Sequence, residues 1–173
     1  MRDIFFVIGG CRSGKSSHAL KIADQLPGNN KYFIATLEPY DSEMKQRVLL
    51  HQKERDKNFI TIEEPLEIGK KIKELDNGKN LFLIDCITLW ISNLLLLKND
   101  PDYVMLEVEK LIQSIDEINS SLIIVSNEVG TGIVPENKLA RQYRDLTGFA
   151  NQKIAKKMDN VIWMVAGIPV KIK

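Results

Sequence analysis

The sequence predicts an α/β fold in which helices cover both faces of a mostly parallel sheet. Two observations support this prediction. Short, continuously apolar runs alternate with longer segments of helical periodicity, and no linker or shift in composition divides the 173 residues. Strands that are apolar on both sides need helices on both faces of their sheet. Hydrophobic residues make up 44% of the chain and charged residues 27%, which suits one globular domain over residues 1–173.

The first third of the chain begins with a strand, a helix and a second strand. Residues 4–8 (IFFVI) are β-branched and aromatic and end at a glycine pair, which is typical of a buried strand. Residues 16–26 place apolar side chains on one helical face until a Pro-Gly pair stops the pattern. Residues 31–36 (KYFIAT) predict the second strand, residues 41–55 have helical character, and residues 59–62 favour a short third strand.

The rest of the chain continues the alternation. Residues 66–75 predict a short helix that an Asn-Gly pair ends, and residues 81–85 (LFLID) form an apolar strand that closes on a carboxylate. We then expect a buried helix, an amphipathic helix, a strand, a long helix and the last core strand. These five elements are predicted at residues 88–97, 104–118, 122–126, 137–158 and 161–166.

Composition and charge exclude several classes of protein. Lys and Arg number 24 against 23 Asp and Glu, so the basic excess of a general nucleic-acid binder is missing. Two cysteines, Cys11 and Cys86, are too few for a disulfide framework, and two histidines supply few ligands for zinc. With no membrane-spanning run and no signal-peptide core in the sequence, we expect a cytoplasmic protein.

A phosphate-binding motif lies between the first predicted strand and helix. Residues 9–16, GGCRSGKS, match the pattern G-x-x-x-x-G-K-[ST] in the strand-to-helix context that the motif requires. Glycines let the backbone pass close to a phosphate, and N–H groups of the loop and the helix N-terminus favour an anion. Lys15 is expected to reach the β- and γ-phosphates of a nucleoside triphosphate, and the Ser16 hydroxyl to ligate Mg²⁺. The alternative is a chance glycine-rich turn.

Asp85 ends the apolar strand at residues 81–85, at the carboxyl edge of the predicted sheet. Open α/β sheets bind their ligands at that edge, so the carboxylate suits a Walker-B position near the magnesium. The alternative is a helix N-cap or a solvated strand end.

A histidine lies on a charged face of the segment at residues 41–55. Glu43, Arg47, His51 and Arg55 are spaced by four, so they share one helical face. Positive charge on both sides disfavours imidazolium and keeps His51 neutral, which is its nucleophilic form. The spacing alone is more typical of a solvated, charged helix face, and no chemistry is assigned to His18.

A second polar group follows the strand at residues 122–126. Asn127 and Glu128 come at its carboxyl end, and Arg141 and Arg144 lie on the next predicted helix. These side chains could position a phosphorylated substrate, or they could belong to a capped turn and a solvated helix.

Longer motifs extend over most of the chain. They are, in order, GGCRSGKS at 9–16, YFIATLE at 32–38, DSEMKQRVLLHQKER at 41–55, TIEEP at 61–65, LIDCITLWISNLL at 83–95, VSNEVGTGIVPENKLARQYRDLTGFANQKIA at 125–155 and GIPVKIK at 167–173. With these motifs the sequence resembles the bifunctional adenosylcobinamide kinase / adenosylcobinamide-phosphate guanylyltransferase family of cobalamin biosynthesis. The run NEVGTGIVPE is far more specific than the phosphate motif alone.

The resemblance implies two reactions and a set of site residues. ATP or GTP phosphorylates the aminopropanol hydroxyl of adenosylcobinamide, and GMP from GTP is then transferred to that phosphate through a guanylyl-histidine, for which His51 is the matching residue. The resemblance also implies a P-loop NTPase-type fold, a homotrimer, and Mg²⁺ held by Ser16 and Asp85. The expected nucleotide contacts are Gly9, Gly10, Cys11, Arg12, Ser13, Gly14, Lys15, Ser16, Thr36, Leu37, Glu38, Gln52, Lys53, Glu54, Arg55, Glu63 and Asp85.

Three other classes of nucleotide-binding protein are alternatives to this interpretation. A small metabolite kinase would use the same phosphate loop without a nucleophilic histidine. A switch GTPase is disfavoured because the D-x-x-G match at residues 145–148 lies inside a helical pattern and no N-K-x-D motif is present. The balanced charge also disfavours a nucleic-acid-dependent ATPase.

Overall fold

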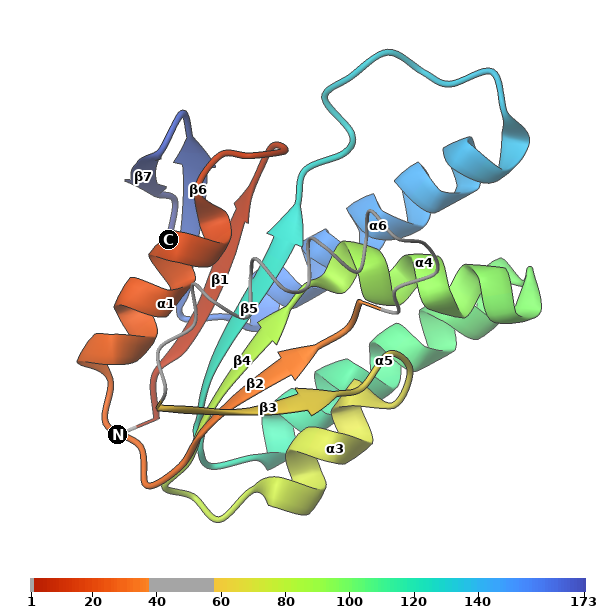
Figure 1. Cartoon of the computed structure of the whole chain (residues 1–173). Helices are drawn as coiled ribbons and strands as arrows, with labels where there is room; N and C mark the ends of the chain where they lie inside the picture. The colour runs from red at the N-terminus through yellow and green to blue at the C-terminus, as the bar shows by residue number, and fades with distance from the viewer. Residues whose placement is uncertain (1, 38–57) are drawn as a thin grey trace.

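The structure, a computed structural model, describes residues 2–37 and 58–173. The strands are β1 (Ile4–Gly9), β2 (Lys31–Ala35), β3 (Phe59–Glu63), β4 (Leu81–Asp85), β5 (Ser121–Asn127), β6 (Asn160–Val165) and β7 (Ile168–Lys171). The helices are α1 (Lys15–Gln25), α3 (Ile68–Leu75), α4 (Ile87–Lys98), α5 (Pro101–Glu117) and α6 (Lys138–Lys157). The strands form one sheet in the order β3-β2-β4-β5-β1-β6-β7 (Figure 1), and every neighbouring pair is parallel except β6 and β7.

Helices cover both faces of the sheet, as the apolar strands predict. The chain moves one way along the sheet from β1 to β2 and the opposite way from β3 to β4, from β4 to β5 and from β5 to β6. Because parallel crossovers are right-handed, opposite directions put the connecting helices on opposite faces. The core follows this division. Val7 packs in one cluster with Ala19 and Ala23 of α1, and Phe6 packs in the other with Trp90 of α4 and with apolar residues of α3, α5 and α6.

The predicted strands and helices are confirmed within the described ranges, most of their ends to within one residue, and three larger differences are found. Helix α5 begins at Pro101 and not at 104, because the Asp100 carboxylate accepts the Asp102 N–H (2.9 Å) and proline suits the first turn. Helix α3 begins at Ile68 and not at 66, because the Glu64 carboxylate accepts the N–H groups of Leu66 (3.0 Å) and Glu67 (2.8 Å) in a turn before the helix. The helix predicted at residues 41–55 lies outside the described residues.

Strand β7 is the third difference, since the sequence predicted residues 161–166 as the last strand. The chain turns at Ala166 and Gly167, which have φ of 50° and 83°, and β7 then pairs antiparallel with β6. All four β7 residues are exposed, and the strand is only four residues long and contains Pro169, which weakens the strand signal of the alternating Ile168, Val170 and Ile172.

A buried hydroxyl joins the carboxyl ends of β2 and β4. Thr36 is fully buried, and its Oγ1 donates to the Cys86 carbonyl (2.8 Å) and accepts the Cys86 N–H (2.8 Å). Its carbonyl accepts the amide of Asn93 on α4 (2.7 Å). Thr36 therefore fixes the chain just after Asp85 relative to the neighbouring strand.

Thr36→Val is expected to lower the free energy of unfolding by about 2–3 kcal/mol, because it leaves the buried Cys86 N–H without its Thr36 acceptor and removes one of the two donors to the Cys86 carbonyl, which keeps the Trp90 N–H (3.2 Å). For a chain of this size the melting temperature should fall by roughly 5–10 °C. Thr36→Ser is the matched control: it keeps the hydroxyl and loses one buried methyl group, worth about 1 kcal/mol. Equal melting temperatures for the two variants would contradict the role given to these hydrogen bonds.

Candidate nucleotide site

The phosphate loop joins β1 to α1 with two residues in the left-handed backbone region, Arg12 (φ 54°) and Gly14 (φ 88°). Lys15 is only 7% exposed, and its Nζ donates to the Gly10 carbonyl (2.5 Å) and lies 3.4 Å from the Ser13 Oγ. The ammonium therefore lies inside the curve of the loop, where a phosphate would meet it.

The first turn of α1 adds backbone donors to this charge. The first helical hydrogen bond runs from the His18 N–H to the Gly14 carbonyl (3.0 Å), so the preceding N–H groups have no helical partner. No side chain caps the helix at Gly14, and its first turn holds no acidic residue. These N–H groups and the helix dipole favour an anion at this point.

The turn between β6 and β7 supports the loop from one side. The Gly167 N–H donates to the Ser13 carbonyl (3.1 Å). A Cβ at Gly9 would lie 2.5 Å from the Met164 carbonyl oxygen, so a side chain there would displace the neighbouring strand. The sequence analysis missed this support because it depends on β7.

Asp85 lies on the far side of β5 from the phosphate loop, two strand spacings or about 10 Å from β1. Burial lowers the pKa of Lys15, while the nearby Cys86 thiol and Asp85 carboxylate act in the opposite direction. Asp85 is therefore close enough to Lys15 for its charge to act on the ammonium. The phosphate loop and Asp85 thus lie at one edge of the sheet.

A chain of polar side chains runs behind these two groups. The Thr88 Oγ1 lies 3.0 Å from the Cys86 Sγ and accepts the side-chain amide of Asn127 (2.8 Å). The Asn151 amide donates to the Asn127 carbonyl (3.2 Å), and its oxygen accepts the Ser126 hydroxyl (2.7 Å). This chain ties the end of β5 to α4 and α6. The sequence analysis proposed a site role for Asn127 but not for Thr88 or Asn151. A single Thr or Asn inside a helical pattern carries no local signal of such a role.

The two arginines that follow β5 hold the loop at residues 128–137. Arg141 donates to the carbonyls of Pro135 (3.1 Å) and Glu136, and Arg144 donates to the Gly130 carbonyl. Both side chains therefore bind the backbone of their own chain. This arrangement favours the capped turn over the alternative that the two arginines position a phosphorylated substrate. The Nη1 atom of Arg144 is buried and has no hydrogen-bond partner among the described residues.

The remaining predicted contacts are dispersed. Glu63 is exposed at the end of β3, four strands or about 19 Å from β1, so it lies apart from the phosphate loop. Leu37 follows Thr36 at the end of β2. The predicted residues Glu38, His51, Gln52, Lys53, Glu54 and Arg55 lie outside the described ranges.

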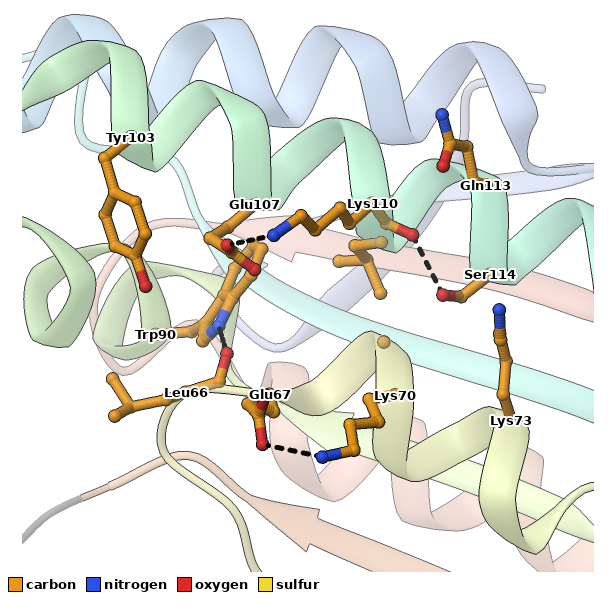
Figure 2. Close-up of a pocket in the computed structure, with 12 residues that line it drawn as sticks. Leu66, Glu67, Lys70, Lys73, Trp90, Tyr103, Glu107, Lys110, Gln113 and Ser114 are labelled. Atoms are coloured by element: carbon orange, nitrogen blue, oxygen red, sulfur yellow. Dashed lines mark hydrogen bonds and ion pairs between the residues drawn. The ribbon is translucent and has the colours of Figure 1, made fainter.

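A cavity of about 340 Å³ lies between α3, α4 and α5, away from the phosphate loop (Figure 2). Its lysines are paired with carboxylates, Lys70 with Glu67 (3.3 Å) and Lys110 with Glu107 (2.7 Å), and the Trp90 indole donates to the Leu66 carbonyl (2.8 Å). None of its lining residues belongs to the phosphate loop.

Residues 2–37 and 58–173 contain no cluster of three or more His, Cys, Asp or Glu side chains that could hold a metal ion. They also contain no helix long and apolar enough to cross a membrane.

The fold and the loop define a nucleotide-binding protein of the P-loop NTPase class. Three solved structures share its fold: the RadB recombinase (14% identity, TM-score 0.52, 93% of this chain and 73% of that one); an ATPase of a type III secretion system (12%, 0.56, 98% and 56%); and project PH0250 from Pyrococcus horikoshii (8%, 0.58, 100% and 88%). At these identities the likeness concerns the fold alone.

Sequence comparison gives the family. Residues 5–172 match the family described as cobinamide kinase / cobinamide phosphate guanyltransferase. The chain is 38% identical to the bifunctional adenosylcobalamin biosynthesis protein CobP of Pseudomonas aeruginosa over 100% of this chain and 98% of that protein. It is 37% identical to CobU of Salmonella typhimurium over 98% and 99%. The chain therefore belongs to this family of bifunctional cobalamin-biosynthesis enzymes.

The two cysteines offer a chemical test of the loop. Cys11 is exposed in the loop, whereas Cys86 is buried, and burial raises its pKa to about 11. At neutral pH a thiol reagent should modify Cys11 and leave Cys86 intact in the folded protein, as mass spectrometry of peptides would show. ATP or GTP at about ten times its Kd should slow the modification of Cys11 by roughly tenfold, because only the free protein reacts. A rate unchanged at saturating nucleotide would contradict binding at this loop, and denatured protein, in which both thiols react, is the control.

Proposed function

We propose that this enzyme phosphorylates adenosylcobinamide with ATP or GTP, and then transfers GMP from GTP to the new phosphate to give adenosylcobinamide-GDP. The observation that carries the proposal is the match over residues 5–172 to a family described by both activities. The position of Lys15 in the curve of the phosphate loop, at the sheet edge that also carries Asp85, supports a nucleotide site there.

In the kinase step the acceptor hydroxyl attacks the γ-phosphorus, the bond to the bridging oxygen breaks, and the nucleoside diphosphate leaves with the electron pair. Lys15 stabilises the charge that develops on the phosphates, and the N–H groups at the start of α1 hold the oxygens in place. The buried position of Lys15 strengthens this interaction because little water screens it.

The described residues fit a magnesium ion of the kind that nucleotides bring with them. Mg²⁺ binds through one or two protein oxygens, several waters and substrate phosphates, and needs no cluster of protein ligands. The Ser16 hydroxyl in the first turn of α1 and the Asp85 carboxylate at the end of β4 are the proposed ligands. The ion would neutralise charge on the β- and γ-phosphates.

In the guanylyl step we propose His51 as the nucleophile. Its imidazole nitrogen attacks the α-phosphorus of GTP and pyrophosphate leaves. A phosphate oxygen of the acceptor then attacks the same phosphorus and releases the imidazole, which splits the transfer into two displacements. Arg47 and Arg55, each four residues from His51 in the sequence, are proposed to favour the neutral imidazole that this step needs. Gln52, Lys53, Glu54, Arg55 and Glu63 remain proposed nucleotide contacts.

The active unit proposed here is a homotrimer. The acceptor is a large corrinoid, and a chain of 19.7 kDa has limited room to enclose it. A face of exposed apolar side chains on β6 and β7, with Trp163 paired to Val170 and Val165 to Ile168, is available for contact between subunits.

Lys15→Ala is expected to reduce the phosphorylation of cobinamide by about 10²–10³-fold, since it removes a preorganised charge at the transferring phosphate. Turnover with labelled ATP, compared with the charge-retaining Lys15→Arg, gives the measurement, and circular dichroism confirms that each variant folds. Near-normal phosphorylation by Lys15→Ala would show that this loop is not the kinase site.

His51→Ala is expected to lose guanylyl transfer and retain phosphorylation of cobinamide, because the kinase step uses the substrate hydroxyl and needs no protein nucleophile. Incubation with α-labelled GTP should give an acid-labile, base-stable label on the wild-type protein only. A small metabolite kinase would give no protein label at all. Label on the His51→Ala variant, mapping to another residue, would overturn the assignment.

A further inference from the structure

The loop at residues 128–137, between β5 and α6, presents apolar side chains to solvent. Ile133 is 97% exposed and the adjacent Val134 is 65% exposed. A single exposed apolar residue is ordinary on a protein surface, but two neighbouring ones at the tip of a loop form a candidate contact surface. We refer to Ile133 and Val134 as the apolar tip.

The apolar tip belongs to the same edge of the sheet as the phosphate loop. β5 lies next to β1, and Asn127 at its end is in register with Gly9. The next residue, Glu128, donates its N–H to the Gly9 carbonyl (2.9 Å). Figure 1 shows the loop leaving the end of β5 beside the turn between β1 and α1 and extending beyond the sheet.

The loop is held at its base while its tip stays exposed. Arg141 and Arg144 donate to the carbonyls of Gly130, Pro135 and Glu136, on both sides of the tip. The Glu128 carboxylate also accepts the Gly130 N–H (2.6 Å). The apolar tip is thus positioned before any ligand arrives, which reduces the entropy lost on binding.

We propose that the apolar tip is the docking surface for the macrocycle of the corrinoid acceptor. This inference rests on the proposed function and adds to it the place where the acceptor binds. The acceptor must bring one hydroxyl to the γ-phosphate while its large ring, with methyl-bearing faces and amide side chains, stays outside the phosphate loop. The apolar tip offers an apolar contact at that edge, on the loop whose first residue, Glu128, is hydrogen-bonded to the Gly9 carbonyl of the phosphate loop.

The test compares the binding of cobinamide and of nucleotide to the same variants. In equilibrium dialysis, followed by the visible absorbance of the corrinoid, Ile133→Ser combined with Val134→Ser should raise the Kd for cobinamide about tenfold. The Kd for GTP should stay unchanged, because neither side chain belongs to the phosphate loop. Ile133→Leu should keep the wild-type Kd for cobinamide. Since Ile133 is almost fully exposed, its truncation should not lower the melting temperature.

Leu106→Ser is the matched control, because Leu106 is 53% exposed on α5 and lies outside the site; it should leave both Kd values unchanged. Sedimentation of each variant identifies the other possible occupant, a second copy of this chain. If the double Ser variant changes the oligomeric state, the tip is a subunit contact and the proposal is wrong. If the wild type phosphorylates cobinamide and the double variant binds it equally well, the proposed function stands and the docking surface is wrong. If the wild type neither binds nor phosphorylates cobinamide, both are wrong.

Discussion

Two backbone hydrogen bonds, one on each side of the phosphate loop, fix the loop in the site. The Gly9 carbonyl accepts the Glu128 N–H at the exit of β5, and the Ser13 carbonyl accepts the Gly167 N–H from the turn after β6. These bonds fix the loop between its two neighbouring strands, so its N–H groups and Lys15 face the open edge of the sheet. Because Glu128 also begins the loop at residues 128–137, the same contact sets where that loop stands relative to a bound phosphate.

The position of Asp85 follows from the order of the strands. β5 lies between β4 and β1, so the strand that ends at Asp85 and the strand that leads into the phosphate loop are two strand spacings, or about 10 Å, apart. The polar chain through Thr88, Asn127 and Asn151 ties the intervening strand to α4 and α6. Lys15 and Asp85 therefore lie next to buried, hydrogen-bonded side chains that fix the surrounding backbone. Their charges are already in position when charge develops on the phosphates during the reaction.

Much of this arrangement was predictable because it depends on local signals. Continuous apolar runs gave the parallel strands, and GGCRSGKS in its strand-to-helix context gave the phosphate loop with Lys15. Asp85 was placed correctly at the end of a buried strand. What escaped prediction depends on contacts between distant residues. Strand β7 is only four residues long and contains a proline, Thr36 bonds to Cys86 fifty residues away, and the support of Ser13 by Gly167 needs the completed sheet. The role of His51 stays a prediction.

The anchoring of the loop at residues 128–137 has a consequence for how readily the enzyme could be redirected to other acceptors. Arg141 and Arg144 bind main-chain carbonyl oxygens, which every amino acid supplies, so the anchors do not select the side chains between them. Residues at the tip can therefore be randomised in a library while the loop keeps its course and the phosphate loop keeps its support. Such a separation between scaffold and contact surface is the property that directed evolution needs.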